Sequence, residues 1–267
     1  MAQELVSVIM PTHNEGRFLS ASIESVLAQT YQNFELLITD DCSTDSVTIE
    51  TLKHYRESDP RVKVFYSKKN QGAGPTRNNS IREAQGRYIA FCDGDDRWLP
   101  DKLEKQVAFM EEKHCRLAYS SYYICDEDDN QAGIFIAPKT VTYHGMLRDD
   151  KIGFLTAIYD VKSVGGKFYL PAIKRRQDWA MLIKLLERCR VAYGQKEPLA
   201  IYRLRKGSIS HNKLALVKYN TKVYQEVLGF SKPFSYLYFA VCFMPTFIVK
   251  VIKKKVDSFI YLRKRGR

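Results

Sequence analysis

Two aspartates one residue apart, Asp93 and Asp95, follow a short apolar run and are separated by Gly94. Carboxylates placed together at the end of a buried strand can face one hard cation, because Mg²⁺ and Mn²⁺ take oxygen ligands from carboxylates and substrate phosphates. Such a cation acts as a Lewis acid and neutralises charge on a departing diphosphate. The alternative is a simple acidic turn at a strand end, since this short pattern is common in proteins.

A second acidic pair, Asp40-Asp41, precedes a run of small polar residues that ends at Asp45. Serine, threonine and aspartate favour turns and helix caps, so we expect Asp45 to cap a helix. Asp41 is open to two interpretations. It could belong to the same turn, or it could accept a hydrogen bond from an N–H group of a nucleotide base.

Residues 70–77 form a glycine-bearing loop that leads into a predicted helix. The loop does not have the dinucleotide-binding pattern, because Arg77 stands where the third glycine would be. A guanidinium on the first turn of a helix suits a diphosphate, through charge-assisted hydrogen bonds and the helix N-terminus. The alternative is a solvated arginine at a helix start.

The first half of the chain alternates short apolar runs with segments of helical periodicity. The runs that we predict to be buried strands are 6–10, 34–39, 62–66 and 88–91. Strands that alternate with helices predict a parallel, doubly wound sheet, in which ligands bind beyond the carboxyl ends of the strands. Polar residues follow three of those ends, at 11–15, 40–41 and 93–96.

The second half is less regular, and we expect strands and loops over residues 117–170. An amphipathic helix then extends from Asp178 to about Cys189, with Trp179 among the residues that face a core. A positioned carboxylate can take the proton of an attacking hydroxyl, so Asp178 is a candidate general base. As an acid at a helix start, it could instead be a helix cap.

The chain contains, in order, the segments VSVIMPTHNE, FELLITDDCSTD, NQGAGPTRNNSIREAQGRYIAFCDGDD and, heading a helix, QDW. Four motifs in this order and spacing resemble the family 2 glycosyltransferases of the GT-A fold. The match covers most of residues 5–110 and reappears at 175–210. The resemblance implies a divalent metal-dependent enzyme that transfers a sugar from a nucleotide diphosphate donor, UDP by analogy, to an acceptor hydroxyl with inversion. It also implies an α/β, GT-A-like, doubly wound and mostly parallel sheet.

The resemblance also implies roles for individual positions. The residues expected to bind the nucleotide sugar are Pro11, Thr12, His13, Asn14, Glu15, Asp41, Gly72, Arg77, Asp93, Gly94 and Arg205. Asp93 and Asp95 would hold the divalent cation, Mn²⁺ or Mg²⁺. Asp178 matches the catalytic base of the family.

Two positions depart from the family pattern. Gln177 stands where the family often has an acid, so a second carboxylate beside the base is missing. Arg205 replaces a histidine, and His211 is a substitute candidate for a metal ligand, although a lone histidine in a polar loop is more often structural or solvated. Arg203, Arg205 and Lys206 could screen a diphosphate, or form an exposed basic strand end. The chain also has no Gln-x-x-Arg-Trp motif, which argues against a processive polysaccharide synthase.

The composition of the 267 residues, 45% hydrophobic and 27% charged, is typical of a globular protein. Six cysteines form no CxxC pair, so we expect a reducing compartment, and we expect no secretory signal at the N-terminus. The net charge of +12 is concentrated at residues 250–267, where eight basic residues face one acidic residue. A basic tail beside an apolar stretch favours an anionic membrane surface over nucleic acid as a partner.

Residues 234–252 are almost wholly apolar and approach the roughly 20 residues needed to span a bilayer. A single span would carry the following basic residues across the membrane, against the positive-inside tendency. We therefore favour helices that lie in the membrane interface, with one apolar face. The residues of that face are Ile248, Ile252, Val256, Phe259 and Ile260. The alternative is core packing against the catalytic domain.

We therefore expect a catalytic domain over residues 1–212, with a nucleotide-binding half (1–100) and an acceptor half (101–212). Residues 213–267 are expected to form a helical, basic, membrane-associating region that keeps a cytoplasmic enzyme on the inner face of the cell membrane. By family analogy, the acceptor is a lipid-linked saccharide of surface-polysaccharide assembly. Two other classes are disfavoured. A nucleotidyltransferase would need a lysine-bearing triphosphate loop that residues 11–17 do not contain, and a catalytically silent nucleotide-sugar-binding protein would not need every motif occupied.

Overall fold

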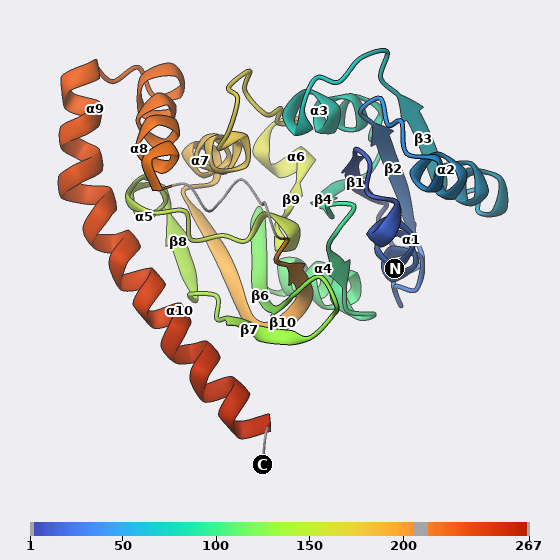
Figure 1. The fold of residues 1–267 in the computed structure, drawn as a ribbon. Helices are drawn as coiled ribbons and strands as arrows, with labels where there is room; N and C mark the ends of the chain where they lie inside the picture. Colours follow the sequence, from blue (N-terminus) through green and yellow to red (C-terminus); the bar gives the residue numbers. More distant parts are fainter. Residues whose placement is uncertain (1–2, 206–212, 266–267) are drawn as a thin grey trace.

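One mixed sheet of ten strands organises the described part of the chain, residues 3–205 and 213–265 of a computed structural model (Figure 1). The order across the sheet is β3-β2-β1-β4-β9-β6-β10-β5, with β7 beside β6 and β8 beside β10. The strands are β1 (Val6–Thr12), β2 (Phe34–Asp40), β3 (Val62–Tyr66), β4 (Tyr88–Phe91), β5 (Arg97–Trp98), β6 (Leu117–Cys125), β7 (Gln131–Phe135), β8 (Thr140–Thr142), β9 (Ile158–Asp160) and β10 (Val191–Arg203).

Helices flank this sheet on both sides and continue beyond it at the C-terminal end (Figure 1). They are α1 (Gly16–Leu27), α2 (Ser46–Ser58), α3 (Ala73–Glu83), α4 (Lys102–Glu112), α5 (Tyr143–Arg148), η1 (Phe154–Thr156), α6 (Val161–Val164), α7 (Gln177–Cys189), α8 (Lys213–Lys222), η3 (Val223–Val227), α9 (Lys232–Tyr238), η4 (Phe239–Phe243) and α10 (Met244–Arg265).

The strands β3, β2, β1 and β4 run parallel, as predicted. Side chains of β1 alternate between the two faces of the sheet. Val8 and Met10 belong to the core that contains apolar residues of α1, α2 and α4, whereas Ile9 belongs to the core that contains residues of α3 and α7. Both faces are therefore covered by helices, and the predicted doubly wound α/β fold is confirmed.

The second half of the sheet adds antiparallel strands to this parallel unit. Strand β9 pairs antiparallel with both β4 and β6, and β6 pairs parallel with β10. The short strands β5, β7 and β8 are antiparallel to their neighbours. The loops that follow β1, β2 and β4 lie at the carboxyl ends of these strands, which is where ligands bind in such sheets.

Helix α7 carries a fully buried apolar face that joins the sheet to the C-terminal helices. The Trp179 indole N–H donates a hydrogen bond to the Met146 carbonyl oxygen at 2.9 Å. Its ring centroid lies 5.6 Å from that of Tyr224 and 5.5 Å from that of Phe243, both with edge-to-face geometry. Because Tyr224 and Phe243 are fully buried, the first part of the C-terminal region packs on the core formed by the sheet and its helices.

Helix α10 runs along the outside of the protein (Figure 1), and polar side chains of the helix contact the rest of the fold. The Ser258 hydroxyl exchanges hydrogen bonds of 3.1 Å with both backbone groups of Ile134 in β7. Lys250 pairs with Asp149 at 2.6 Å. The large apolar residues of α10 that stay exposed are Ile248, Val249, Ile252, Val256, Phe259, Ile260 and Leu262. The shared apolar face predicted for this helix thus points away from the protein.

The stretch Lys232–Lys264 has the length and hydropathy of a membrane-crossing helix, with an 18-residue window of mean hydropathy 1.7, of which only 17% is buried. The low burial distinguishes it from the core helix of a globular protein. Length and composition do not by themselves separate a span from a helix that lies in the interface.

Candidate active site

A cavity of about 280 Å³ lies at the carboxyl ends of β1, β2 and β4. Its wall consists of Pro11, Thr12, His13, Glu15, Asp41, Asn70, Gly72, Ala73, Thr76, Arg77, Asp93 and Asp95. Most of the residues predicted to bind a nucleotide sugar are therefore in one place. Of the others, Asn14, Gly94 and Arg205 contact the wall or lie directly behind it, and His211 falls outside the described residues.

Asp41 holds the loop that leads into α3. Its two carboxylate oxygens accept hydrogen bonds from the backbone N–H groups of Gln71 at 2.9 Å and Gly72 at 2.7 Å. Gly72 has a φ of +83°, which a side chain would disfavour. Asp41 thus shapes this wall of the cavity, and each of its oxygens keeps a second lone pair for a ligand N–H.

Asn14 and Gly94 support the wall from behind. The Asn14 side-chain oxygen accepts hydrogen bonds from the backbone N–H groups of Thr44 at 2.8 Å and Asp45 at 3.0 Å. Asp45 itself caps α2, as predicted, by accepting from Val47 and Thr48. A Cβ at Gly94 would lie 2.3 Å from a Glu15 carboxylate oxygen, so a glycine is needed here for Glu15 to approach the Asp93–Asp95 turn.

Arg77 reaches the Asp93–Asp95 turn from the first two turns of α3. One of its terminal nitrogens lies 2.5 Å from an Asp93 carboxylate oxygen. The guanidinium carbon lies 5.4 Å from the centre of the Phe154 ring, and the side chain is only 10% exposed. Its buried Nε has no hydrogen-bond partner among the described residues, although Arg77 belongs to the cavity wall.

Arg205 bridges the two other acids of the site. Its Nη1 lies 3.2 Å from Glu15 Oε1 and 3.2 Å from Asp95 Oδ2. Burial first, and then repulsion from Asp95 and Asp93, raises the pKa of Glu15 to about 8. Burial and the nearby Asp93 charge also raise the pKa of Asp95. The free site therefore contains more carboxylates than its two arginines neutralise.

These acids fit a divalent cation that is shared with a ligand. Asp93 and Asp95 offer the oxygen donors that Mg²⁺ and Mn²⁺ prefer, and the second Glu15 oxygen is buried without a partner. In the described residues, no group of three His, Cys, Asp or Glu side chains could hold a metal ion by itself. The arrangement thus suits a cation with two protein carboxylates and further oxygens from a diphosphate.

Asp178 lies in the first turn of α7, beside the start of α3. The two helix starts approach closely, since a Cβ at Gly74 would lie 2.5 Å from the Gln177 side chain. Burial lowers the pKa of Arg77, whereas the charges of Asp93 and then Asp178 raise it. The Asp178 carboxylate therefore lies within electrostatic reach of Arg77 in the cavity wall. The cap residue of α7 is Arg176, and Asp178 makes no hydrogen bond or ion pair with another described residue.

A second carboxylate beside Asp178 comes from a distant segment. Asp150 follows α5, forms a 3.2 Å ion pair with Arg176, and has one buried oxygen without a partner. Burial, and then repulsion from Asp178, raises the pKa of Asp150 to about 7. Asp150 is therefore a second acid within electrostatic reach of Asp178.

Comparison with known proteins identifies the family. Residues 7–162 match the family model described as "Glycosyl transferase family 2". The chain belongs to this family. This glycosyltransferase is 42% identical over 224 residues to TuaG of Bacillus subtilis, whose name assigns it to teichuronic acid biosynthesis, with 84% of this chain and 88% of TuaG covered.

A second relative is similar over its full length. The Escherichia coli protein named UDP-Glc:alpha-D-GlcNAc-diphosphoundecaprenol beta-1,3-glucosyltransferase WfgD is 34% identical over 260 residues, with 97% of this glycosyltransferase and 98% of WfgD covered.

Solved structures share the fold. Staphylococcus aureus TarS 1-349 in complex with UDP-GlcNAc matches with a TM-score of 0.67 at 19% identity, over 90% of this chain and 73% of that one. The Pyrobaculum calidifontis mannosyltransferase PcManGT, in complex with GDP-Man and Mn²⁺, matches with a TM-score of 0.64 at 15% identity, over 99% and 80%. The predicted GT-A fold is confirmed.

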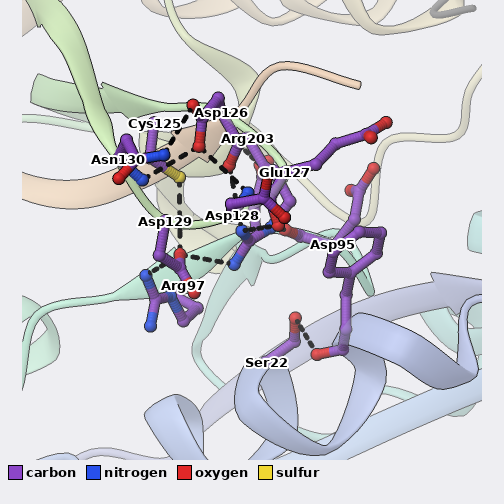
Figure 2. A network of polar contacts seen from close by, with 12 residues as sticks. Ser22, Asp95, Arg97, Cys125, Asp126, Glu127, Asp128, Asp129, Asn130 and Arg203 are labelled. Atoms are coloured by element: carbon purple, nitrogen blue, oxygen red, sulfur yellow. Dashed lines mark hydrogen bonds and ion pairs between the residues drawn. The ribbon is translucent and has the colours of Figure 1, made fainter. Parts of the chain in front are cut away.

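Arg203 of the glycosyltransferase is buried in a network with Asp95 and the loop at 126–129 (Figure 2). It is neither part of the cavity wall nor an exposed strand end, so both interpretations offered by the sequence are wrong for this residue. Its guanidinium donates to the backbone oxygens of Asp95 and Asp126, each at 3.1 Å, and pairs with Asp129 at 2.9 Å. Its side chain is only 3% exposed. Arg203 therefore fixes the backbone of the Asp93–Asp95 turn against the end of β10, whereas Lys206 lies outside the described residues.

Three wall residues were quoted in the sequence motifs without a role of their own. They are Asn70, Ala73 and Thr76. The Asn70 side-chain amide nitrogen donates to Nε2 of the His13 ring at 3.0 Å, and the Thr76 hydroxyl donates to the Gly72 carbonyl oxygen at 2.8 Å. Their signal was their place in the loop at 70–77, of which Gly72 and Arg77 were predicted to belong to the site.

The raised pKa of Glu15 predicts a pH-dependent stability for the ligand-free glycosyltransferase. Between about 4.5 and about 8 the folded protein keeps a proton that the unfolded chain releases, so the free energy of unfolding should fall as the pH rises through this range. Glu15→Gln is neutral at every pH and should not show this loss. In buffer with chelator, the variant should be no more stable than the wild type at pH 4 and at least about 1 kcal/mol more stable near pH 8. Parallel stability curves for the two proteins would show that Glu15 is ionised throughout.

Proposed function

We propose that this glycosyltransferase transfers a hexose from a UDP-sugar to a hydroxyl group of a lipid-linked saccharide, with inversion, in the assembly of a surface polysaccharide. The observation that carries the proposal is the cavity in which Asp93, Asp95 and Arg77 meet at the carboxyl ends of parallel strands. Carboxylates for a shared cation and a guanidinium for a diphosphate are the two requirements for binding a nucleotide diphosphate sugar. The name of WfgD, which includes a UDP-glucose donor and a diphosphoundecaprenol-linked acceptor, supports this choice of substrates.

The donor would lie along the wall from Pro11 to Asp95. Asp41 and the segment Pro11–Thr12 would flank the nucleoside, and Arg77, which belongs to the same wall, would lie beside the diphosphate. Asp93 and Asp95 would hold Mn²⁺ or Mg²⁺, which as a Lewis acid neutralises charge on the diphosphate. Arg77 and Arg205 supply positive charge for the same leaving group, since each already lies against one of these aspartates.

The acceptor side of the reaction rests on Asp178. Its carboxylate takes the proton of the acceptor hydroxyl while the hydroxyl oxygen forms a bond to the anomeric carbon. The bond from that carbon to the diphosphate oxygen breaks at the same time, and the nucleoside diphosphate leaves with the electron pair. Attack from the face opposite the leaving group inverts the configuration of the anomeric carbon.

A turnover assay tests the proposal directly. The purified protein is incubated with Mn²⁺ and single nucleotide sugars, with and without a short-chain lipid diphosphate that carries N-acetylglucosamine, and nucleotide release is measured. We expect one UDP-sugar to be consumed, faster with the acceptor present, and a β-linked product. Consumption of no nucleotide sugar would overturn the proposal. Formation of a nucleotide sugar from a nucleoside triphosphate and a sugar phosphate would make the protein a nucleotidyltransferase.

We further propose that α9 and α10 hold the enzyme on the inner face of the cell membrane without crossing it. Burying each large apolar side chain of the exposed face stabilises binding by about 1.5–3 kcal/mol, and each basic residue near anionic lipid adds about 1 kcal/mol. The polar side of α10 is already used by β7 and Asp149, so the apolar side is the one left for lipid.

Flotation with anionic vesicles measures this association. The wild type should float, and high salt should weaken but not abolish binding, because it screens only the charged contribution. The double change Ile252→Ser and Phe259→Ser should strongly reduce flotation, whereas Val47→Ser, at an exposed apolar position on α2, should not. No flotation of the wild type would contradict the proposal, and cleavage of a C-terminal tag only from the far side of sealed vesicles would show a span.

A further inference from the structure

A second cavity, of about 310 Å³, lies between α10 and the segments that carry β7 and α5. It is distinct from the donor cavity, since the two share no wall residue. Four lysines line it, together with two aspartates and a few apolar residues. The charged residues of the wall are Asp149, Lys151, Lys250, Lys253, Lys254 and Asp257.

The charge of this cavity is only partly balanced within the protein. Lys250 is occupied, because its ammonium group lies 2.6 Å from Asp149 Oδ1 and 2.6 Å from the Asp150 carbonyl oxygen. Lys151, Lys253 and Lys254 form no ion pair or hydrogen bond with any residue in the described ranges. Burial, and then repulsion from Lys250, lowers the pKa of Lys254. Several ammonium groups line the cavity, and Asp257 is the one wall carboxylate in the described residues without an ion pair. This arrangement favours the binding of an anion with more than one charge.

The position of the cavity connects the lipid-facing helix with the candidate base. One wall carries Val249, which is 66% exposed and belongs to the apolar face of α10. The opposite wall carries Asp149 and Lys151. Asp150, between these two residues in the chain, pairs with Arg176 and interacts electrostatically with Asp178. Asp150 therefore connects the wall of the cavity, through its two chain neighbours, with the surroundings of Asp178.

We propose that this lysine-lined cavity binds the diphosphate of the lipid-linked acceptor, so that the attached sugar extends toward Asp178 and the lipid chain leaves along the apolar face of α10. The apolar wall residues Phe135, Ile136 and Val249 suit the first units of the chain. This inference rests on the proposed function, which it deepens by assigning the acceptor to a site of its own. It also gives α10 a second task beside membrane association.

Binding of farnesyl diphosphate to the full chain, measured by calorimetry in detergent below its micelle concentration, tests the site without turnover. The double change Lys253→Gln and Lys254→Gln should weaken binding about tenfold or more, since two charge-assisted contacts are lost. Lys255→Gln is the matched control, because Lys255 is exposed on the same helix and outside the cavity wall. Equal weakening by Lys255→Gln would overturn the proposal, because general surface charge would then explain the binding.

Two competitors identify which phosphate is recognised. Farnesol should not bind, and short-chain phosphatidylglycerol should compete at least about tenfold less well than farnesyl diphosphate, since it carries one phosphate charge in place of a diphosphate. Competition by phosphatidylglycerol at equal concentration would make the cavity a general phospholipid site and overturn the assignment to the acceptor.

A kinetic experiment connects the cavity with the reaction. For the double variant, the KM for a lipid-diphosphate acceptor should rise by about ten times more than the KM for an octyl glycoside with the same sugar and no phosphate. Equal changes for both acceptors would overturn the proposal. If the wild type consumes no nucleotide sugar, the proposed function fails, and calorimetry with farnesyl diphosphate still decides whether the cavity binds a lipid diphosphate.

Discussion

Replacement of Asp178 by asparagine is expected to lower sugar transfer by at least about two orders of magnitude, which is typical of a missing general base. Asparagine has nearly the same shape but cannot take the proton of the acceptor hydroxyl. Because Asp178 makes no hydrogen bond or ion pair with another described residue, the variant should fold normally. Because Asp178 is not part of the donor cavity wall, the thermal shift with uridine diphosphate and Mn²⁺ should be kept.

Glu187→Gln is the control for this experiment. Glu187 lies on the exposed side of the same helix and pairs with Lys184 at 3.3 Å, so the change removes the same charge at the other end of α7. Its transfer rate should stay within about twofold of the wild type, since an exposed ion pair contributes little. A near-normal rate for Asp178→Asn would remove Asp178 from the reaction and leave it as an acid at a helix start.

Asp95→Asn should lower the rate of sugar transfer by a similar factor, about 100-fold or more. The change weakens binding of the shared cation, which stabilises the transition state by several kcal/mol. In the wild type, uridine diphosphate should raise the melting temperature only when Mn²⁺ or Mg²⁺ is present. The variant should show little of this metal-dependent shift, because one of two carboxylate ligands is lost. Thermal unfolding with uridine diphosphate, with metal or with chelator, measures the effect.

The control for Asp95 is Asp128→Asn, which removes a carboxylate that is 73% exposed and pairs with Arg17 at the surface. It should leave both the metal-dependent shift and the transfer rate unchanged. If the wild type is stabilised equally by uridine diphosphate in the presence of excess chelator, the donor does not need a cation, and Asp95 binds it in another way.

The sequence by itself determined the parallel half of the sheet. The four predicted strands are present, with β3 and β4 at the predicted residues and β1 and β2 slightly longer. Strands β1, β2 and β4 are buried throughout, as predicted, whereas β3 lies at the edge of the sheet and is only partly buried, unlike the predicted buried strand. The carboxyl ends of parallel strands lie at one edge of the sheet, so the polar residues after β1, β2 and β4 had to meet. For this reason Glu15, Asp41, Asp93 and Asp95 could be assigned to one site before their distances were known.

Only the tertiary structure decided which charged groups face the cavity. Arg203 and Arg205 lie two residues apart near the end of one strand, but Arg203 is buried under the Asp93–Asp95 turn and Arg205 bridges Glu15 and Asp95. Within a strand, side chains two residues apart point to the same face of the sheet. Arg203 and Arg205 point in different directions because β10 ends at Arg203. The local sequence pattern does not predict, to within one residue, where β10 ends.

The same limit applies to the acceptor side. Asp150 stands beside Asp178 because α5 and α7 pack together through Trp179 and Met146, a contact between segments that are far apart in the chain. The apolar periodicity of α10 indicated an amphipathic helix, but not that its polar side would be used by Ser258 and Lys250 against the protein. Periodicity determines which residues share a face of a helix, whereas the choice of the face that is buried depends on the polar groups that the rest of the fold presents to it.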